Sequence, residues 1–308
     1  ADMRAYPSDE PMNRTPSGAS LDTTRYSSLH PSEEAALLHI SSDGEWGFFQ
    51  TQALRGWVRL DKAALAGGGS MPMASGGFLV VTGSSVSVYS APAFKRPIAE
   101  LPMGTVVRLK ARDFVKGAWV VLFPFRSSSG GLVWKDAYIS AKAQVRRGFL
   151  PYTKRNIIVQ SFKMLGEEYG WGGRDGLRDC SMFVKDVFAT FGVRLPRNSG
   201  AQSLAGIVKA DAGRVQGEDM LGAVMGAEAG LTLLSLDGHI MIYLGKSRGV
   251  PFAINQIAGY RGRRGYMRLN RAAVVGLNAG AGAPTGALLK RIKAVTEVLP
   301  PAYGAAEL

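Results

Sequence analysis

A single cysteine is the strongest candidate for a catalytic residue in this sequence. Cys180 is the only cysteine among 308 residues, which excludes an internal disulfide and any cysteine-rich zinc site. It directly follows Asp179 at the predicted start of a helix, where free backbone N–H groups and the helix dipole favour a thiolate. We therefore expect Cys180 to be a nucleophile whose pKa lies below the ordinary value, and we expect neither a metal nor a cofactor.

A cysteine nucleophile needs a base, and His239 is the best candidate among the three histidines. It opens the predicted strand HIMIYL inside the same domain as Cys180. An imidazole at the tip of a strand that faces a helix N-terminus is the arrangement of a cysteine–histidine pair. The group that orients the ring is predicted to be Asn255, with Gln256 as the alternative, because adjacent strand residues face opposite sides.

The elements around these residues predict an α+β domain over 150–275. The segment NIIVQSFKMLGEEYG predicts a helix, and a Gly-rich loop then leads into a second helix, CSMFVKDVFATFGV, expected to end at Gly192. Predicted strands follow in the order LTLLSL, HIMIYLG and FAINQIAG. The apolar residues expected on one face of the first helix are Ile157, Ile158, Phe162 and Leu165.

The chain before this domain predicts two small β-barrels. Short β-prone runs separated by turn residues occur over 23–68 and 77–142, without a helical pattern. Residues 1–22 lack apolar periodicity and are expected to form an extended arm, and 64–77 reads as a linker or long loop. Residues 276–308 form a C-terminal extension whose structure the pattern does not assign.

The charge of the chain is strongly positive, with 37 Lys and Arg against 24 Asp and Glu. This favours an anionic partner without choosing one. The segment from Lys246 to Arg271 contains seven basic residues and no acidic one, which fits a solvated basic hairpin and a polyanion contact equally well. No nucleic-acid-binding motif is present, so specific nucleic-acid binding is not expected. No apolar run reaches the roughly 20 residues of a membrane span.

Three motifs in order carry a family resemblance. They are YGWGGRDGLRDCSMFVKDVF, FGVRLPRNSGAQ and GHIMIYLG, and they resemble the NlpC-type family of bacterial cell-wall cysteine peptidases over about 152–260. The upstream segments RYSSLHPSEEAALLHISSDGEWGFFQT and RGWV resemble bacterial SH3-like barrels. The resemblance implies a multidomain chain in which two small all-β SH3-like barrels precede an α+β papain-like peptidase domain.

The resemblance also implies roles. Cys180 would attack the peptide carbonyl, and His239 would take and return the proton, with Asn255 at a position where the family commonly has His. The substrate would be a peptidoglycan stem peptide or muropeptide, cut between γ-D-glutamate and a diamino acid. A free N-terminal L-alanine would be held by Asp179 and Ser181, and Tyr169 would line the site. The alternative roles of these three are an N-cap, a polar first-turn residue and core packing, respectively.

Two other functions compete with this one. The same fold is used for amidase and acyl-transfer chemistry, and two barrels could serve a wall-binding protein without catalysis. In the first barrel, Glu45 and Tyr26 are candidate substrate contacts, with surface or core roles equally open. The wall substrate implies a periplasmic or extracellular location, with a signal peptide removed before the first residue given. The sequence does not indicate an oligomeric state.

Overall fold

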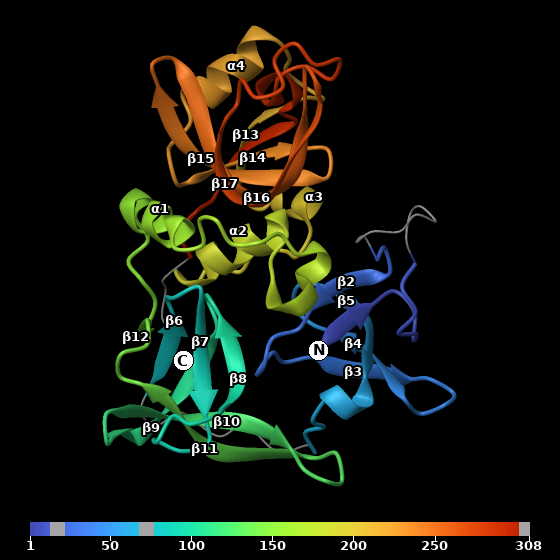
Figure 1. Cartoon of the computed structure of the whole chain (residues 1–308), viewed down its shortest axis with the longest axis vertical. Coiled ribbons are helices and arrows are strands. Elements are labelled where there is room, and N and C mark those ends of the chain that lie inside the picture. The colour runs from blue at the N-terminus through green and yellow to red at the C-terminus, as the bar shows by residue number, and fades with distance from the viewer. Residues whose placement is uncertain (13–21, 68–76, 302–308) are drawn as a thin grey trace. The chain divides into compact units, whose positions relative to one another are not determined.

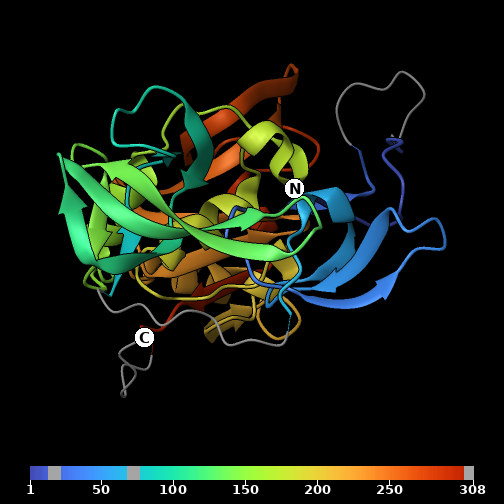
Figure 2. The ribbon, with the colours of Figure 1, turned by 90° about the horizontal axis from the view of Figure 1, so that it is seen from below.

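The computed structural model describes residues 1–12, 22–67 and 77–301. These residues form two compact units, Ala1–Leu150 and Pro151–Ala302. In Figures 1 and 2, the first unit runs from blue to green and consists mainly of strands, whereas the α-helices appear from yellow-green onward. Each unit is described on its own below.

The first part of unit 1 is a five-stranded sheet around a small core. Its strands, in the order β2-β1-β5-β4-β3, leave Met3, Phe49 and Val58 buried between them. Glu45 is exposed and pairs with Arg59, and Tyr26 is also exposed. The elements are β1 (Asp2–Arg4), β2 (Arg25–Ser28), β3 (Ala36–Ile40), β4 (Trp46–Gln50), β5 (Arg55–Arg59) and the 3-10 turn η1 (Leu60–Lys62).

The first residues correct the expectation of an extended arm. Strand β1 pairs with both β2 and β5, and Met3 is fully buried. A strand of three residues with one apolar side chain carries too little alternation to be seen in a sequence pattern. The remainder of the expected arm, 13–21, and most of the expected linker lie outside the described residues.

The second part of unit 1 is a seven-stranded antiparallel sheet in the order β12-β6-β9-β10-β11-β7-β8. Alternation builds it, since Val86 and Val88 of β7 point into the core while their neighbours do not. The elements are β6 (Phe78–Val81), β7 (Ser85–Tyr89), β8 (Pro97–Pro102), β9 (Val106–Val115), β10 (Ala118–Arg126), β11 (Leu132–Ser140) and β12 (Val145–Arg147).

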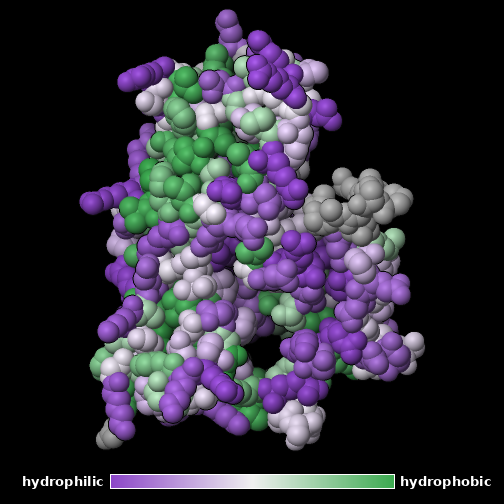
Figure 3. All heavy atoms as spheres, viewed as in Figure 1, coloured by the Kyte–Doolittle hydropathy of each residue, from purple (hydrophilic) through white to green (hydrophobic). Residues whose placement is uncertain are grey.

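Unit 2 begins with helices that are shorter than the pattern predicts. Helix α1 ends at Phe162, and it buries Ile157, Gln160 and Ser161. Phe162 and Leu165, which we expected on the buried face, are 42% and 48% exposed, because the helix stops before Leu165 and its buried face is partly polar. Figure 3 shows hydrophobic surface on this unit in the region of α1. The helical elements are α1 (Lys154–Phe162), η2 (Trp171–Gly176), α2 (Cys180–Ala189), α3 (Ser199–Gln202), α4 (Glu218–Met225) and η3 (Leu288–Arg291).

A six-stranded antiparallel sheet forms the rest of unit 2, in the order β13-β18-β14-β15-β16-β17. The C-terminal extension supplies β18, which lies between β13 and β14 and is therefore part of the sheet. The strands are β13 (Ile207–Asp211), β14 (Thr232–Leu236), β15 (His239–Ser247), β16 (Val250–Gly262), β17 (Gly265–Gly276) and β18 (Ala294–Glu297).

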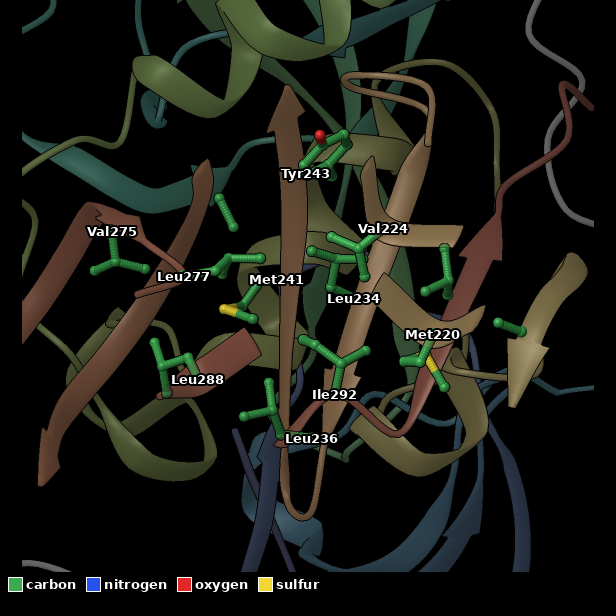
Figure 4. Close-up of a cluster of buried hydrophobic side chains, with 13 residues drawn as sticks. Met220, Val224, Leu234, Leu236, Met241, Tyr243, Val275, Leu277, Leu288 and Ile292 are labelled. Carbon is green, nitrogen blue, oxygen red and sulfur yellow. The ribbon is translucent and has the colours of Figure 1, made fainter. Parts of the chain in front are cut away.

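The two faces of this sheet are covered differently. On one face, side chains of β14, β15 and β17 pack with those of α4 and η3, and Figure 4 shows Met220, Leu234, Met241 and Leu288 together in this cluster. Helix α2 packs against β15 and β16. This packing brings the N-terminus of α2 to the start of β15. None of the described helices is long and apolar enough to cross a membrane.

Candidate active site

Cys180 is the first residue of α2, and Asp179 fixes where that helix begins. Asp179 has extended backbone angles, and its Oδ1 accepts a hydrogen bond from the backbone N–H of Met182 at 2.9 Å. This is an N-cap bond, which satisfies a backbone donor that a helix leaves free at its first turn. The cap therefore sets the position of the thiol, and only 7% of the Cys180 residue is exposed.

The Gly-rich loop before α2 holds Asp179 from the other side. Gly172 and Gly173 adopt φ values of 61° and 80°, a left-handed conformation that glycine adopts without steric cost. The Gly172 N–H donates to Asp179 Oδ2 at 3.1 Å. A side chain at Gly170 would lie 2.3 Å from Leu177 Cβ, so this loop closes tightly on itself. The glycines thus let the loop wrap the cap residue of α2.

His239 starts β15 and is oriented by Asn255 of the neighbouring strand β16. The His239 Nε2 and Asn255 Oδ1 atoms are 2.8 Å apart. The amide orientation of Asn255 follows from its other hydrogen bond, which Nδ2 donates to the Ala273 carbonyl at 3.3 Å. Because Oδ1 can only accept, His239 Nε2 carries the proton, and Nδ1 is left with a free lone pair. The ring is therefore in the tautomer in which Nδ1 can act as a base.

The thiol lies beside the start of this same strand. The backbone N–H of Ile240, the residue after His239, interacts with the Cys180 sulfur. Gln256 faces the opposite side of β16, where its Nε2 donates to the carbonyls of Glu167 and Glu168. The structure thus brings together Cys180, His239 and Asn255, and gives Gln256 a different set of partners.

The electrostatics of the pair differ from the sequence expectation. Burial, and then the adjacent Asp179 carboxylate, raise the pKa of Cys180 to about 12, although the Ile240 and Ser181 N–H groups act in the other direction. Burial also lowers the pKa of His239 below its ordinary 6.5, against the opposing effect of Asn255. A helix N-terminus does favour a thiolate, but here desolvation and a neighbouring anion outweigh it. At neutral pH the free site therefore holds a thiol and a neutral imidazole.

Arg197 is a residue of this site that we did not predict. Its Nη2 donates to Asp179 Oδ2 at 2.6 Å, and its Nη1 donates to Asp179 Oδ1 at 3.0 Å and to Ser181 Oγ at 2.8 Å. Burial lowers the pKa of Arg197, but Asp179, followed by Cys180 and Asp186, acts in the other direction, and the pKa is raised overall. The only signal for this pair in the sequence was the motif LPRN, which gives no indication of a partner.

The two predicted amine-binding residues are therefore already engaged. Asp179 and Ser181 are 7% and 5% exposed, and both lie within the hydrogen bonds of Arg197. Tyr169 is partly buried in the loop next to them, and its N–H donates to the Asn270 carbonyl of β17 at 3.1 Å. Burial raises the pKa of Tyr169, followed by the effects of Cys180 and Asp179. Tyr169 thus lies within electrostatic range of the thiol.

A second buried ion pair supports the same helix. Arg178 Nε donates to Asp186 Oδ2 at 2.7 Å, and Nη1 donates to Glu167 Oε2 at 3.1 Å. Arg178 directly precedes the cap residue, and Asp186 lies two turns along α2. These bonds therefore hold the segment before the helix against the helix itself and against the loop after α1. Gln202 of α3 adds a bond from Nε2 to the Ser181 carbonyl at 2.8 Å. The first turn of α2 is therefore held by polar contacts from several segments of unit 2.

The fold and the site define a domain class, and a family comparison agrees. Residues 166–258 match the model of the NlpC/P60 family, and residues 11–59 match that of an SH3 domain of the SH3b1 type. The chain therefore carries an NlpC/P60 domain behind an SH3-like domain, as the resemblance implied. Neither matched range covers the seven-stranded sheet, so the predicted division into two barrels stays a prediction.

Individual relatives extend the comparison. The chain is 28% identical over 134 residues to a gamma-D-glutamyl-L-lysine dipeptidyl-peptidase of Bacillus cereus, which covers 42% of this chain and 38% of the relative. It is 51% identical over 47 residues to a probable endopeptidase p60 of Listeria innocua, which covers 15% of this chain and 10% of the relative. The chain thus spans well under half the length of these curated relatives.

Two solved structures share the fold over nearly the whole chain. An NlpC/P60 endopeptidase from Photobacterium damselae subsp. piscicida superimposes with a TM-score of 0.79 at 19% identity, covering 97% of this chain and 72% of that one. An NlpC/P60 family protein from Bacillus cereus gives a TM-score of 0.67 at 16% identity, covering 97% of both chains. At these identities the likeness concerns the fold.

Proposed function

We propose that this protein is a cysteine peptidase that hydrolyses peptidoglycan stem peptides. The observation that carries the proposal is the orientation of His239, whose Nε2 proton is held by Asn255 while the Cys180 thiol lies beside the next residue of the same strand. A base with a free Nδ1 next to a buried thiol at a helix N-terminus is suited to nucleophilic attack on a carbonyl.

The proposed mechanism follows from the resting protonation states. As Cys180 Sγ attacks the peptide carbonyl carbon, its proton passes to Nδ1 of His239, and Asn255 supports the imidazolium through Nε2–H. Collapse of the tetrahedral intermediate transfers that proton to the leaving amine and leaves a thioester on Cys180. Water, deprotonated by His239, then cleaves the thioester, releases the acid product and restores the thiol.

For the substrate, we propose the bond between γ-D-glutamate and a diamino acid. The name of the Bacillus cereus relative, a gamma-D-glutamyl-L-lysine dipeptidyl-peptidase, supports this choice. Recognition of a free N-terminal L-alanine by Asp179, Ser181 and Tyr169 is part of the proposal. Both carboxylate oxygens of Asp179 already accept hydrogen bonds from Arg197. The ammonium group of the substrate would therefore bind to a remaining lone pair on one of these two oxygens. Such a substrate places the activity in the periplasm or outside the cell.

The test is mass-spectrometric digestion of L-Ala-γ-D-Glu-diaminopimelate by the wild type, Cys180→Ala and His239→Ala. We expect cleavage after γ-D-Glu by the wild type only, with a loss of at least about a hundredfold for the histidine variant. His39→Ala is the matched control, since this histidine lies in β3 of unit 1 with its ring against Trp57, and it should retain full turnover.

Two further substrates separate the competing functions. The same tripeptide with an acetylated N-terminus should be cut poorly if the free amine is recognised. Turnover of a simple ester in place of the peptide would favour the amidase or acyl-transfer function. Retention of the wild type on insoluble peptidoglycan without any turnover would overturn the peptidase proposal and favour a wall-binding protein.

A further inference from the structure

The hairpin between β16 and β17 extends past the rest of the sheet at the end where His239 stands. Ile242 of β15 pairs with Ile254 of β16 in an antiparallel register, so continuing that register places Ile257 level with His239, the first residue of β15. The ladder between β16 and β17 nevertheless runs on to the pair Gly262 and Gly265. We call residues 258–269 the arm. It therefore begins at the catalytic edge of the sheet and projects beyond it.

The arm is anchored on one side and open on the other. Tyr260 and Leu269 pack against the buried cluster of unit 2. Arg261 and Tyr266 are directly opposed across the two strands, so their side chains share one face. Tyr266 is 60% exposed. The arm thus has a fixed position relative to the sheet and presents an aromatic and a cationic side chain together.

Tyr266 leans back along the hairpin toward the catalytic edge. A Cβ placed on Gly259 would lie 2.7 Å from Tyr266 Cζ and 2.8 Å from its hydroxyl oxygen, so the ring crosses the strand where a side chain is absent. Tyr169 lies at the base of the arm, since its N–H donates to the Asn270 carbonyl of β17. The raised pKa of Tyr169, caused first by burial and then by Cys180, also contains a contribution from Tyr266. Tyr266 and the Cys180 thiol therefore both lie within electrostatic range of Tyr169.

The charge of the arm has one sign. It carries four arginines, all exposed, and no acidic residue occurs between Gly238 and Thr296. Among the described residues, no salt bridge joins any of the four to a carboxylate of this chain. Arg263 also lies close to the loop at Gly282, where an added Cβ would be 3.2 Å from Arg263 Nε. The arginines of the arm are Arg261, Arg263, Arg264 and Arg268.

We propose that the arm is a substrate-binding element that recognises an acidic stem peptide. Tyr266 packs against the peptide next to Tyr169, and Arg261 pairs with one of its free carboxylates, a contact for which a guanidinium is well suited. This inference rests on the proposed function. A peptide is favoured over a remote polymer because the arm begins at the edge of the sheet where His239 stands. The family match ends at residue 258, so most of the arm lies outside the matched range.

The test compares two substrates and three forms of the protein. L-Ala-γ-D-Glu-diaminopimelate and the same peptide with its free carboxyl groups amidated are offered to the wild type, Tyr266→Ala and Arg261→Gln. We expect Tyr266→Ala to raise KM about two- to tenfold with kcat unchanged. Arg261→Gln should raise KM about two- to fivefold for the acidic peptide and leave the amidated one unaffected.

Arg248→Gln is the matched control, because it removes the same charge from the turn between β15 and β16, at the opposite end of β15 from His239. An equal effect of this variant would show that only net charge matters and would overturn the proposal. An unchanged KM in both arm variants would also overturn the proposal. The same holds if the arm variants differ from the wild type only in weaker retention on a phosphate-bearing wall polymer.

Binding distinguishes a failure of this inference from a failure of the proposed function. Calorimetric titration of Cys180→Ala with the acidic tripeptide, alone and combined with each arm substitution, requires no turnover. If the wild type is inactive but arm substitutions weaken binding by the stated factors, the arm proposal stands without the peptidase. If they leave binding unchanged, the arm proposal fails whether or not the protein is a peptidase.

Discussion

Unit 1 and unit 2 are similar in length but differ in the polar groups that they bury. Among the described residues, five polar or charged side chains are buried in unit 1 and fourteen in unit 2. In unit 1 they lie mostly next to strand ends and turns. In unit 2 many of them, including Arg178, Asp179 and Asn255, surround the first turn of α2 and the start of β15. A domain that only needed a stable core would not require them, because buried polar groups contribute little net stability.

The ion pairs show the same contrast at single contacts. Lys110 and Asp136 of unit 1 are joined at 2.9 Å with side chains 41% and 42% exposed. Arg197 and Asp179 of unit 2 are joined at 2.6 Å with side chains 6% and 9% exposed. Loss of the exposed pair changes the free energy of unfolding little, because water solvates both charges. Loss of one partner of the buried pair leaves an unpaired charge inside the protein. The comparison indicates that the polar network of unit 2 is there to position groups.

The largest effect is expected from breaking that network. Arg197→Met should reduce the free energy of unfolding by about 3–5 kcal/mol, because Asp179 would remain buried without its cation. Urea denaturation, followed by hydrogen exchange of peptides from unit 2, measures this. Lys110→Met is the control in unit 1, with an expected cost of at most about 1 kcal/mol. Equal costs at the two positions would remove the distinction between the units.

A smaller effect is expected when the amide of Asn255 is removed, and it concerns the activation free energy of catalysis only. Asn255→Ala should lower kcat roughly a hundredfold with little change in KM, because His239 loses the acceptor that fixes its tautomer. Steady-state kinetics on the tripeptide measures this. Gln256→Ala is the adjacent control, since among the described residues that side chain donates to backbone carbonyls of the loop and not to His239. A similar loss of kcat in both variants would mean that orientation by Asn255 is not what matters.

The smallest effect is a pH dependence of stability. His239 has a folded-state pKa below its ordinary 6.5, so below that pH the unfolded chain takes up a proton that the folded chain does not. Stability should therefore fall as pH drops from 6.5 toward the folded pKa, by at most about 1.4 kcal/mol per pH unit. His239→Gln should abolish this component in urea titrations between pH 4 and pH 7. An identical pH profile for wild type and variant would contradict the shift.

The sequence predicted the elements of the site well and their electrostatics poorly. A cysteine after an aspartate, and a histidine before an alternating strand, mark a helix start and a strand start by local pattern alone. The sign of the Cys180 pKa shift depends instead on burial and on the distance to Asp179, which tertiary packing sets. For the same reason Arg197 was missed, since its partner is 18 residues away. Strands β1 and β18 were missed because each is short and pairs only with distant segments.

A protonated Cys180 also makes the free site less sensitive to chemical modification. Oxidants and alkylating agents react with thiolates far faster than with thiols. A chain with one cysteine has no second thiol with which to form a reversible disulfide, so an overoxidised nucleophile could not be recovered internally. A neutral thiol on a residue that is only 7% exposed is therefore protected from such reagents, and under the proposed mechanism it reacts once a peptide carbonyl and the imidazole act on it together.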